Sequence, residues 1–168
     1  VMVVIREVSP LFTALIVIAR SGTAVASELG SMQVNKEIES LKVMGIDHYS
    51  YVVFPRIFAG VISLVGLVFY FNIVALIGGF LVAGQSAHLP FTIYINSITE
   101  HMTLFDLSLI MLKNIFAGFI IFTICSYMGL SVKKSPHEVP QVTTKAVVYS
   151  IAGVMFTNLA MTIIYYSV

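Results

Sequence analysis

The segment from Ile57 to Gly84 limits the possible folds most, because it carries no charged side chain and only Ser63 and Asn72 as polar interruptions. A transmembrane α-helix needs about 20 predominantly apolar residues to cross roughly 30 Å of hydrocarbon. This segment is long enough to span a bilayer with some tilt. A second uncharged run, Ala146 to Val168, has the same character. The chain is therefore predicted to be an integral membrane protein.

The composition of the whole chain supports this prediction and suggests the number of spans. Hydrophobic residues make up 58% and charged residues only 10% of the sequence, with a mean hydropathy of +0.98. Soluble domains carry about 25% charged residues. The 168 residues leave room for four spans and their loops. We expect an all-α, polytopic transmembrane protein with a single domain over residues 1–168 and spans at about 5–26, 57–84, 104–130 and 146–168.

The first predicted span has a stripe of small residues on one face. Positions at intervals of four from Ala14 to Gly30 hold small side chains, with Ile18 as the exception. Small residues at this spacing let another helix approach closely within a membrane. The pattern favours simple helix packing at Gly22, Ala26 and Gly30.

The polar stretch between Arg20 and Arg56 contains a short amphipathic segment. From residue 34 to 44, apolar side chains recur every three or four positions with charged and polar ones between them, which predicts a helix with one apolar stripe. Gly45 is a natural C-terminal stop. A helix of about three turns is too short to cross a bilayer, so it lies on the membrane surface or docks onto a partner protein, and the pattern leaves both open. The stripe consists of Val34, Ile38, Leu41 and Met44.

The basic residues predict the orientation of the chain in its membrane. A four-span topology places seven of them in or beside the loops of one face, while the other face has Arg6 and, at most, Lys113. By the positive-inside rule the basic face is cytoplasmic. The amphipathic helix is then cytoplasmic and the end of the chain lies on the outer side. The seven residues are Arg20, Lys36, Lys42, Arg56, Lys133, Lys134 and Lys145.

Several function classes lack their motifs in this sequence. It contains no phosphate-binding GxxxxGK[ST] loop and no GxGxxG after a strand, and no GxSxG or catalytic triad order that would suggest a hydrolase. The net charge of +1 gives no reason to expect nucleic-acid binding. The single cysteine, Cys125, forms no internal disulfide. The four histidines, scattered without ligand spacing so that a metal site is not expected, are His48, His88, His101 and His137.

Charges within the predicted spans are the better indication of function, because a buried charge costs a few kcal/mol unless it is paired or faces water. Arg6 and Glu7 lie near the outer end of the first span, where they line a lipid headgroup site or form an interfacial ion pair. Asp106 and Lys113 lie two turns apart on one helix face, too far for a direct salt bridge, so each needs another partner. The Lys113 side chain either snorkels outward, so that its ammonium group reaches the membrane interface, or has a role in a cavity, and the sequence leaves both alternatives open.

These charges leave room for a function independent of ATP. In an ion-coupled secondary transporter or channel, Asp106, Lys113 and Glu100 would form the ion path, although the sequence shows no internal repeat of the kind frequent in such folds. A scaffold without transport activity is a further alternative.

A set of short motifs along the whole chain resembles the MlaE family of ABC-transporter permeases. The usual Gly before the first proline is Ser9 here, and a Gly-Cys pair near the end of the third span is replaced by Cys125-Ser126. These departures affect local packing and remove no charged residue. The matching pieces are Arg6-Glu7-x-x-Pro10, Thr13-Ala14, Arg20-x-Gly22-x-Ala24, Glu28-Leu29-Gly30-x-Met32, Glu37-Ile38-x-x-Leu41, Met44-Gly45, Pro55-Arg56, Lys113, Gly129 and Thr143-Thr144-x-Ala146-Val147-Val148.

The resemblance implies a non-catalytic permease subunit that moves phospholipid or a similar lipid. Such permeases are homodimers in the bacterial inner membrane and work with a cytoplasmic ABC ATPase, which binds the ATP and Mg²⁺, so no cofactor is expected in this chain. Other partners are an MCE-domain lipid-binding protein on the outer, periplasmic side and in many systems a STAS-domain subunit. Family members usually have a further helix before the position of Val1, and since the sequence lacks an initiator Met, we expect an N-terminal part to precede it.

The resemblance also assigns roles to individual residues. Residues 28–45 match the cytoplasmic coupling region that sits in a groove of the ATPase. Arg6, Glu7 and Lys113 match charged positions near the lipid cavity. The residues assigned to ATPase coupling are Glu28, Met32, Glu37, Ile38, Leu41 and Met44.

Overall fold

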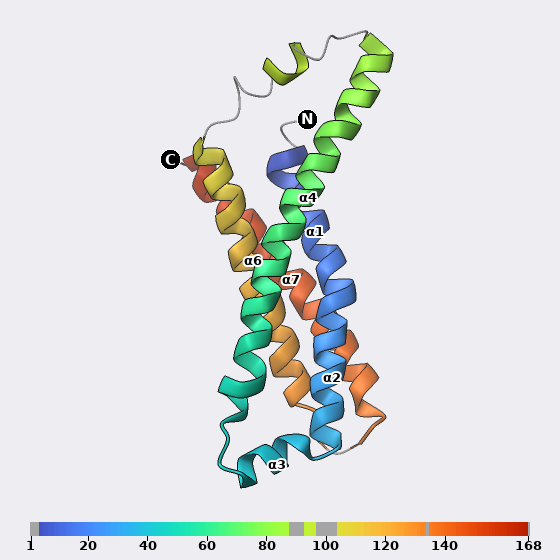
Figure 1. Ribbon diagram of the computed structural model, residues 1–168, viewed down its shortest axis with the longest axis vertical. Helices are drawn as coiled ribbons and strands as arrows, with labels where there is room; N and C mark the ends of the chain where they lie inside the picture. The colour runs from blue at the N-terminus through green and yellow to red at the C-terminus, as the bar shows by residue number, and fades with distance from the viewer. Residues whose placement is uncertain (1–3, 88–92, 97–103, 134, 168) are drawn as a thin grey trace.

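The computed structural model describes residues 4–87, 93–96, 104–133 and 135–167, and within these ranges every regular element is a helix (Figure 1). Four helical stretches are long and apolar enough to cross a membrane. This confirms the predicted all-α fold with four spans. The stretches are Ile5–Val34, Tyr49–Val82, Asp106–Leu130 and Glu138–Ile164. The predicted loop residues His88, Glu100 and His101 lie outside the described residues.

The first stretch is one continuous helix with two wider turns. It consists of η1 (Val4–Val8), α1 (Ser9–Val17), η2 (Ile18–Gly22) and α2 (Thr23–Val34), where η denotes a π-helical turn. Pro10 has no N–H to donate to the carbonyl of the preceding turn, and the π-helical turn η1 lies directly before it. The helix passes the predicted end at residue 26 because the sequence from 23 to 34 contains no proline and only one glycine.

The predicted helix over residues 34–44 is interrupted near its start. Val34 ends α2, Lys36 adopts a left-handed conformation with φ of 60°, and α3 covers only Glu37–Val43. The expected stop at Gly45 is present: its φ is 75°, its N–H donates to the Lys42 carbonyl, and the next N–H donates to the Leu41 carbonyl. This pair of bonds is a Schellman motif. As a result, α3 is a short separate helix that lies across one end of the bundle (Figure 1).

The second span begins earlier than predicted. The π-helical turn η3 (Tyr49–Val53) leads directly into α4 (Phe54–Ala87). Pro55 has no N–H to donate to the preceding turn, and that turn is the π-helical η3. The Asp47 carboxylate accepts hydrogen bonds from the Ser50 hydroxyl at 2.7 Å and from the backbone N–H groups of Tyr49 and Ser50. These bonds lower the pKa of Asp47, with the Ser50 hydroxyl as the largest cause. They hold the start of this helix in place.

The last two helices are α6 (Leu104–Leu130) and α7 (Glu138–Ser167). The helix α7 starts within the segment predicted as a polar loop, where hydropathy gives no signal. Pro140 does not prevent this start, because it falls in the first turn of the helix. The fourth helix therefore begins eight residues before the predicted boundary, at Glu138 and not at Ala146.

The helix α6 is the centre of the bundle and packs against α2, α4 and α7. The small residues of the first helix lie on this buried side: Ala26 is 1% exposed, and a Cβ at Gly22 would lie 3.1 Å from Cys125 Sγ. From the other side, a Cβ at Gly129 would meet the Ala26 carbonyl oxygen at 2.8 Å. Glycine at residues 22 and 129 lets the first helix and α6 approach closely.

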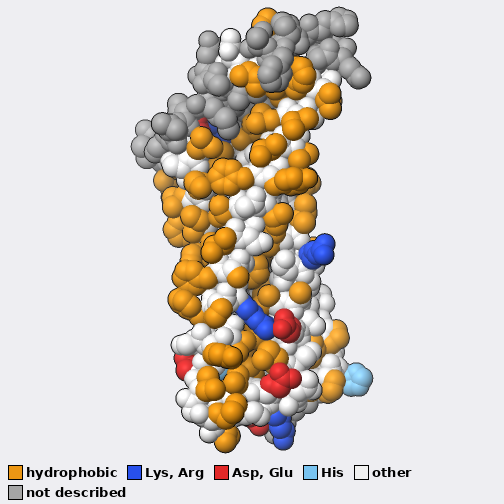
Figure 2. All heavy atoms as spheres, in the orientation of Figure 1, with side chains coloured by type: hydrophobic (Ala, Val, Ile, Leu, Met, Phe, Trp, Pro, Cys, Tyr) orange, Lys and Arg blue, Asp and Glu red, His pale blue; other side chains and the backbone are white. Residues whose placement is uncertain are grey.

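The outer surface is largely apolar. Figure 2 shows hydrophobic side chains along the flank of the bundle, while most of the charged side chains visible on that face gather toward the end that holds α3. Large side chains such as Ile62, Phe156 and Leu159 are more than half exposed. A surface of this kind suits contact with lipid or with other transmembrane helices.

Candidate functional site

Two ion pairs connect the first helix to α6 at the end of the bundle opposite α3. Arg6 Nη2 donates to Asp106 Oδ2 at 2.7 Å, and the Asp106 side chain is 2% exposed. Lys113 Nζ donates to Glu7 Oε1 at 2.8 Å, and the Lys113 side chain is 8% exposed. Arg6 and Glu7, which are adjacent in η1, thus pair with Asp106 and Lys113, which lie two turns apart on α6.

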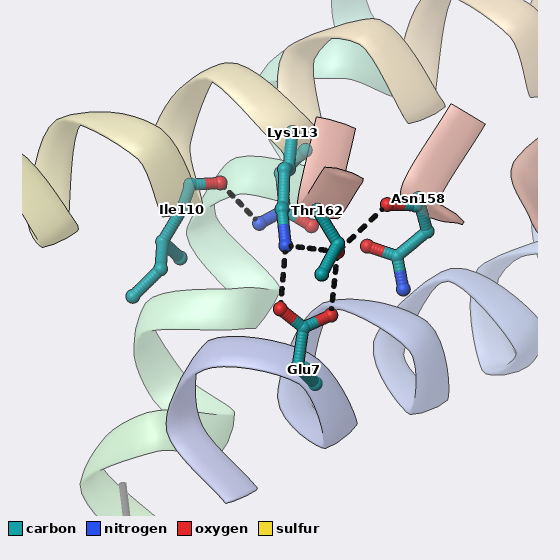
Figure 3. Close-up of polar contacts among 6 residues, drawn as sticks. Glu7, Ile110, Lys113, Asn158 and Thr162 are labelled. Atoms are coloured by element: carbon teal, nitrogen blue, oxygen red, sulfur yellow. Dashed lines mark hydrogen bonds and ion pairs between the residues drawn. The ribbon is translucent and has the colours of Figure 1, made fainter. Parts of the chain in front are cut away.

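The second pair extends to α7 through Thr162 (Figure 3). Lys113 Nζ also donates to Thr162 Oγ1 at 2.9 Å. The Thr162 hydroxyl lies 3.0 Å from Glu7 Oε2 and 2.9 Å from the Asn158 carbonyl oxygen, and it donates its single hydrogen to one of these acceptors at a time. Three helices therefore meet at one ion pair.

The sequence predicted that Asp106 and Lys113 each need another partner, and the structure confirms this. The alternative in which Lys113 snorkels outward is wrong, because its ammonium group points into the bundle toward Glu7. Of the two alternatives for Arg6 and Glu7, the ion pair agrees with the structure, in which both residues pair with α6 and anchor the first helix. Each pair joins opposite charges, which reduces the cost of burial.

The space beside this network is small within one chain. A cavity of about 10 Å³ lies next to Lys113, Pro10 and Asn158, enough for about one water molecule. The Asn158 side-chain oxygen is buried and has no hydrogen-bond partner within the described part of the chain. This cavity between the described residues is too small for a lipid.

At the other end, an ion pair ties α2 to the start of α4. Arg56 Nη2 donates to Glu28 Oε1 at 2.7 Å and lies 3.9 Å from Met32 Sδ. Two of the six residues assigned to ATPase coupling, Glu28 and Met32, therefore lie on α2 and contact the Arg56 side chain. They are part of the first long helix and not of α3.

The Glu28–Arg56 pair should contribute modestly to stability. Arg56→Glu places two carboxylates together, and we expect it to destabilise the protein by about 0.5–1 kcal/mol, since Glu28 is 61% exposed and solvent screens such pairs. The double variant Glu28→Arg/Arg56→Glu should recover most of this loss in thermal unfolding of the full-length protein. Equal stability of the single and double variants would show that the pair contributes nothing.

The short helix α3 presents a different face from the one predicted. Ile38 is 2% exposed and packs within the chain, so its assigned contact with an ATPase is not available in this structure. Glu37 is exposed, Leu41 is half-buried, and Met44 is 63% exposed. Val43, which is not part of the predicted apolar stripe, is 89% exposed. Ile38 and Val43 lie on opposite sides of α3, since five residues turn a helix by about 140° from one side chain to the other. The break at Lys36 separates only Val34 from the rest of the stripe.

No group of three metal-ligand side chains comes together in the ranges that the structure describes. His48 is the most buried of the histidines in these ranges, and it lies beside Asp47 and Tyr49. The charges of the bundle are instead arranged as ion pairs between helices.

The family of the chain follows from a comparison with known protein families. The family model described as Permease MlaE matches residues 1–164. The chain belongs to the MlaE permease family. This agrees with the motifs of the first helix, and it places the two ion pairs and α3 within a permease domain.

Similar proteins are known from bacteria and from a plant. A probable ABC transporter permease protein of Rickettsia typhi is 31% identical over 94% of this chain and 61% of its own length. The intermembrane phospholipid transport system permease protein MlaE of Haemophilus influenzae is 28% identical over 95% of this chain and 62% of its own. The chloroplastic protein TRIGALACTOSYLDIACYLGLYCEROL 1 of Arabidopsis thaliana is 30% identical over 93% and 45%. The chain thus spans about three fifths of the length of the two bacterial relatives.

Proposed function

We propose that this chain is part of the permease subunit of an ATP-driven ABC transporter that moves phospholipid or a similar lipid. The observation that carries the proposal is the MlaE family match over residues 1–164. The phospholipid assignment draws on the printed name of the Haemophilus influenzae relative. The chain itself is non-catalytic in this proposal, and ATP and Mg²⁺ are bound by a separate ATPase.

The coupling surface for this ATPase is formed by α3 and its C-terminal turn. Glu37, Val43 and Met44 are exposed there, and Leu41 is half-buried beside them. An exposed apolar group beside charges suits a groove on a partner protein. The basic residues that gather at this end favour a cytoplasmic location in a bacterial inner membrane, with the C-terminal end of the chain on the periplasmic side.

The lipid headgroup is assigned to the opposite end, near Arg6, Glu7 and Lys113. The cavity beside them in the described part of the chain is water-sized, and the lipid cavity in this proposal is formed between two copies of the permease. An MCE-domain protein on the periplasmic side would exchange lipid with this cavity, and a STAS-domain subunit would bind at the cytoplasmic side. These partners rest on the family assignment.

Transport by the assembled complex tests the proposal. The full-length protein with its ATPase, reconstituted in vesicles with a fluorescent phospholipid, is expected to move lipid only when ATP is hydrolysed. Lipid movement driven by an ion gradient without ATP would contradict the proposal and favour the secondary transporter, in which Asp106 and Lys113 would have to leave their ion pairs.

The coupling surface has its own test in co-purification with the ATPase. We expect Leu41→Asp and Glu37→Arg to weaken ATPase binding at least about tenfold, which corresponds to about 1.4 kcal/mol. Gln141→Arg is the matched control, because it changes the charge of an exposed residue near the same end but outside α3. Unchanged ATPase binding and activity in both α3 variants would show that the coupling assignment is wrong.

A further inference from the structure

A separate cavity of about 390 Å³ lies between the start of the second span and the last turns of α6. It is close to the end that holds α3, whereas the paired charges of Arg6 and Lys113 lie at the other end. Its volume falls within the roughly 300–1,000 Å³ of typical ligand pockets. The lining residues used below are Tyr49, Val53, Ile57, Thr123, Ser126 and Tyr127.

The cavity results from the way in which α4 and α6 cross. One turn farther into the bundle, Gly60 lies directly against the ring of Phe122, and a Cβ at Gly118 would lie 3.1 Å from the backbone of Val61. Glycine brings the two helices together there. Toward α3, the second span continues into the π-helical turn η3. There Tyr49 of η3 and Tyr127 of α6 line the cavity, whereas glycines stand one turn farther in. The helices therefore leave a hollow that their own side chains do not fill.

Among the described residues, the lining of this cavity is apolar with hydroxyl groups and contains no charged side chain. Ser126 is 2% exposed, and its Oγ has no hydrogen-bond partner within the described ranges. Buried hydroxyl groups are normally hydrogen-bonded, and a rotation of the Ser126 side chain toward the cavity would give this one a ligand acceptor as its partner. Thr123 adds a second hydroxyl one turn away. The ligand is therefore expected to carry a neutral hydrogen-bond acceptor attached to an apolar body.

The position of the cavity indicates where such a ligand comes from. Tyr49 is the first residue of one apolar span, and Leu130, also in the lining, is the last residue of another. Tyr49 is 58% and Tyr127 73% exposed, as is typical of tyrosines at a membrane interface. Phe54 and Phe58 continue from the cavity along α4 as exposed apolar side chains. This is the depth at which the ester groups of membrane lipids lie.

We propose that this cavity binds the glycerol ester region of a diacyl lipid from the leaflet on the α3 side. The Ser126 hydroxyl donates to an ester carbonyl, and the first methylenes of one acyl chain pack on Val53 and Ile57. The charged headgroup stays in the water phase, since none of the described residues that line the cavity is charged. The site is distinct from the proposed transport cavity and does not depend on it.

Photolabelling of the full-length protein tests this site. The protein is placed in nanodiscs with a phosphatidylethanolamine that carries a diazirine near the ester end of one acyl chain, and labelled peptides are mapped by mass spectrometry. We expect saturable labelling of residues 49–57 and 123–131. Thr123→Trp fills the mouth of the cavity and should reduce this labelling at least about fivefold. Ile62→Trp is the matched control, because Ile62 is 70% exposed on α4 outside the cavity, and it should leave the labelling unchanged.

A smaller change tests the role of the hydroxyl group. Ser126→Ala removes one oxygen atom without adding volume, so the fold should be retained. The lipid fraction at half-saturation should rise about threefold to tenfold, as expected for one lost hydrogen bond. Labelling that does not saturate, or that is equal in the wild type and Thr123→Trp, would overturn the proposal. So would labelling that disappears on assembly with the ATPase or a second copy, since a protein would then be the occupant.

Discussion

Lys113→Met is expected to destabilise the full-length protein by about 2–3 kcal/mol. Removing one partner of a fully buried ion pair typically costs about 3–5 kcal/mol. We expect a smaller loss than for a fully buried pair because Glu7 is 34% exposed, although Lys113 itself is only 8% exposed. The substitution leaves the Glu7 carboxylate facing Thr162 alone. Thermal or denaturant unfolding in detergent measures the effect.

The double variant Glu7→Gln/Lys113→Met separates the ion pair from simple packing. Because both charges are gone, we expect it to be at least about 1 kcal/mol more stable than Lys113→Met. Together with the Glu7→Gln single variant, the three unfolding measurements give the coupling energy of a double-mutant cycle. Lys145→Met makes the same substitution at an exposed position of α7 and should change stability by less than about 0.5 kcal/mol. Strict additivity of the two single variants would mean that the 2.8 Å contact contributes no stability.

Gly60→Ala is the second change with a large expected effect. A Cβ at this position would overlap the ring of Phe122, which is only 3% exposed and has little room to move. Overpacking of this kind costs about 1–3 kcal/mol. Gly66→Ala is the matched control on the same helix, since a Cβ there meets nothing within 4 Å. It should be neutral or slightly stabilising, because alanine favours a helix more than glycine does.

The partner of Gly60 provides a rescue experiment. Phe122→Leu removes the ring that a Cβ at residue 60 would meet, so Gly60→Ala should cost less in a Phe122→Leu background than in the wild type. Unfolding of the four variants gives the coupling between the two positions. If Gly60→Ala and Gly66→Ala have the same effect, α4 and α6 are not in close contact at Gly60.

The four spans could be predicted from the sequence because hydropathy acts over whole segments. The predicted bounds of the third span agree with α6, whereas the start of the fourth could not be predicted: the first turns of α7 are polar, and a proline in the first turn, Pro140, is compatible with a helix. The stop of α3 at Gly45 was predictable because a left-handed glycine is a local signal. The left-handed Lys36 was not, because lysine gives no such signal. The burial of Ile38 and exposure of Val43 depend on which face of α3 packs against the bundle, which the short helix alone does not determine.

The candidate site was predictable as a set of residues but not as a set of contacts. The sequence placed Arg6, Glu7, Asp106 and Lys113 within membrane spans, where a charge needs a partner. Glu7 and Lys113 are 106 positions apart in the chain, so their pairing depends on how the first helix packs against α6. The hydrogen bonds of Thr162 with Lys113 and Glu7 could not be predicted from the sequence, because threonine is common in such helices and its hydroxyl often bonds its own backbone.

The continuity of the first helix has a mechanical consequence. The stretch from Ile5 to Val34 contains 30 residues and is about 45 Å long at 1.5 Å per residue. Glu7 lies at one end of this helix and the junction with α3 at the other. The π-helical turn at Ile18–Gly22 interrupts the regular winding near the middle. The ion pairs at one end of the bundle and α3 at the other are thus joined by one continuous helix.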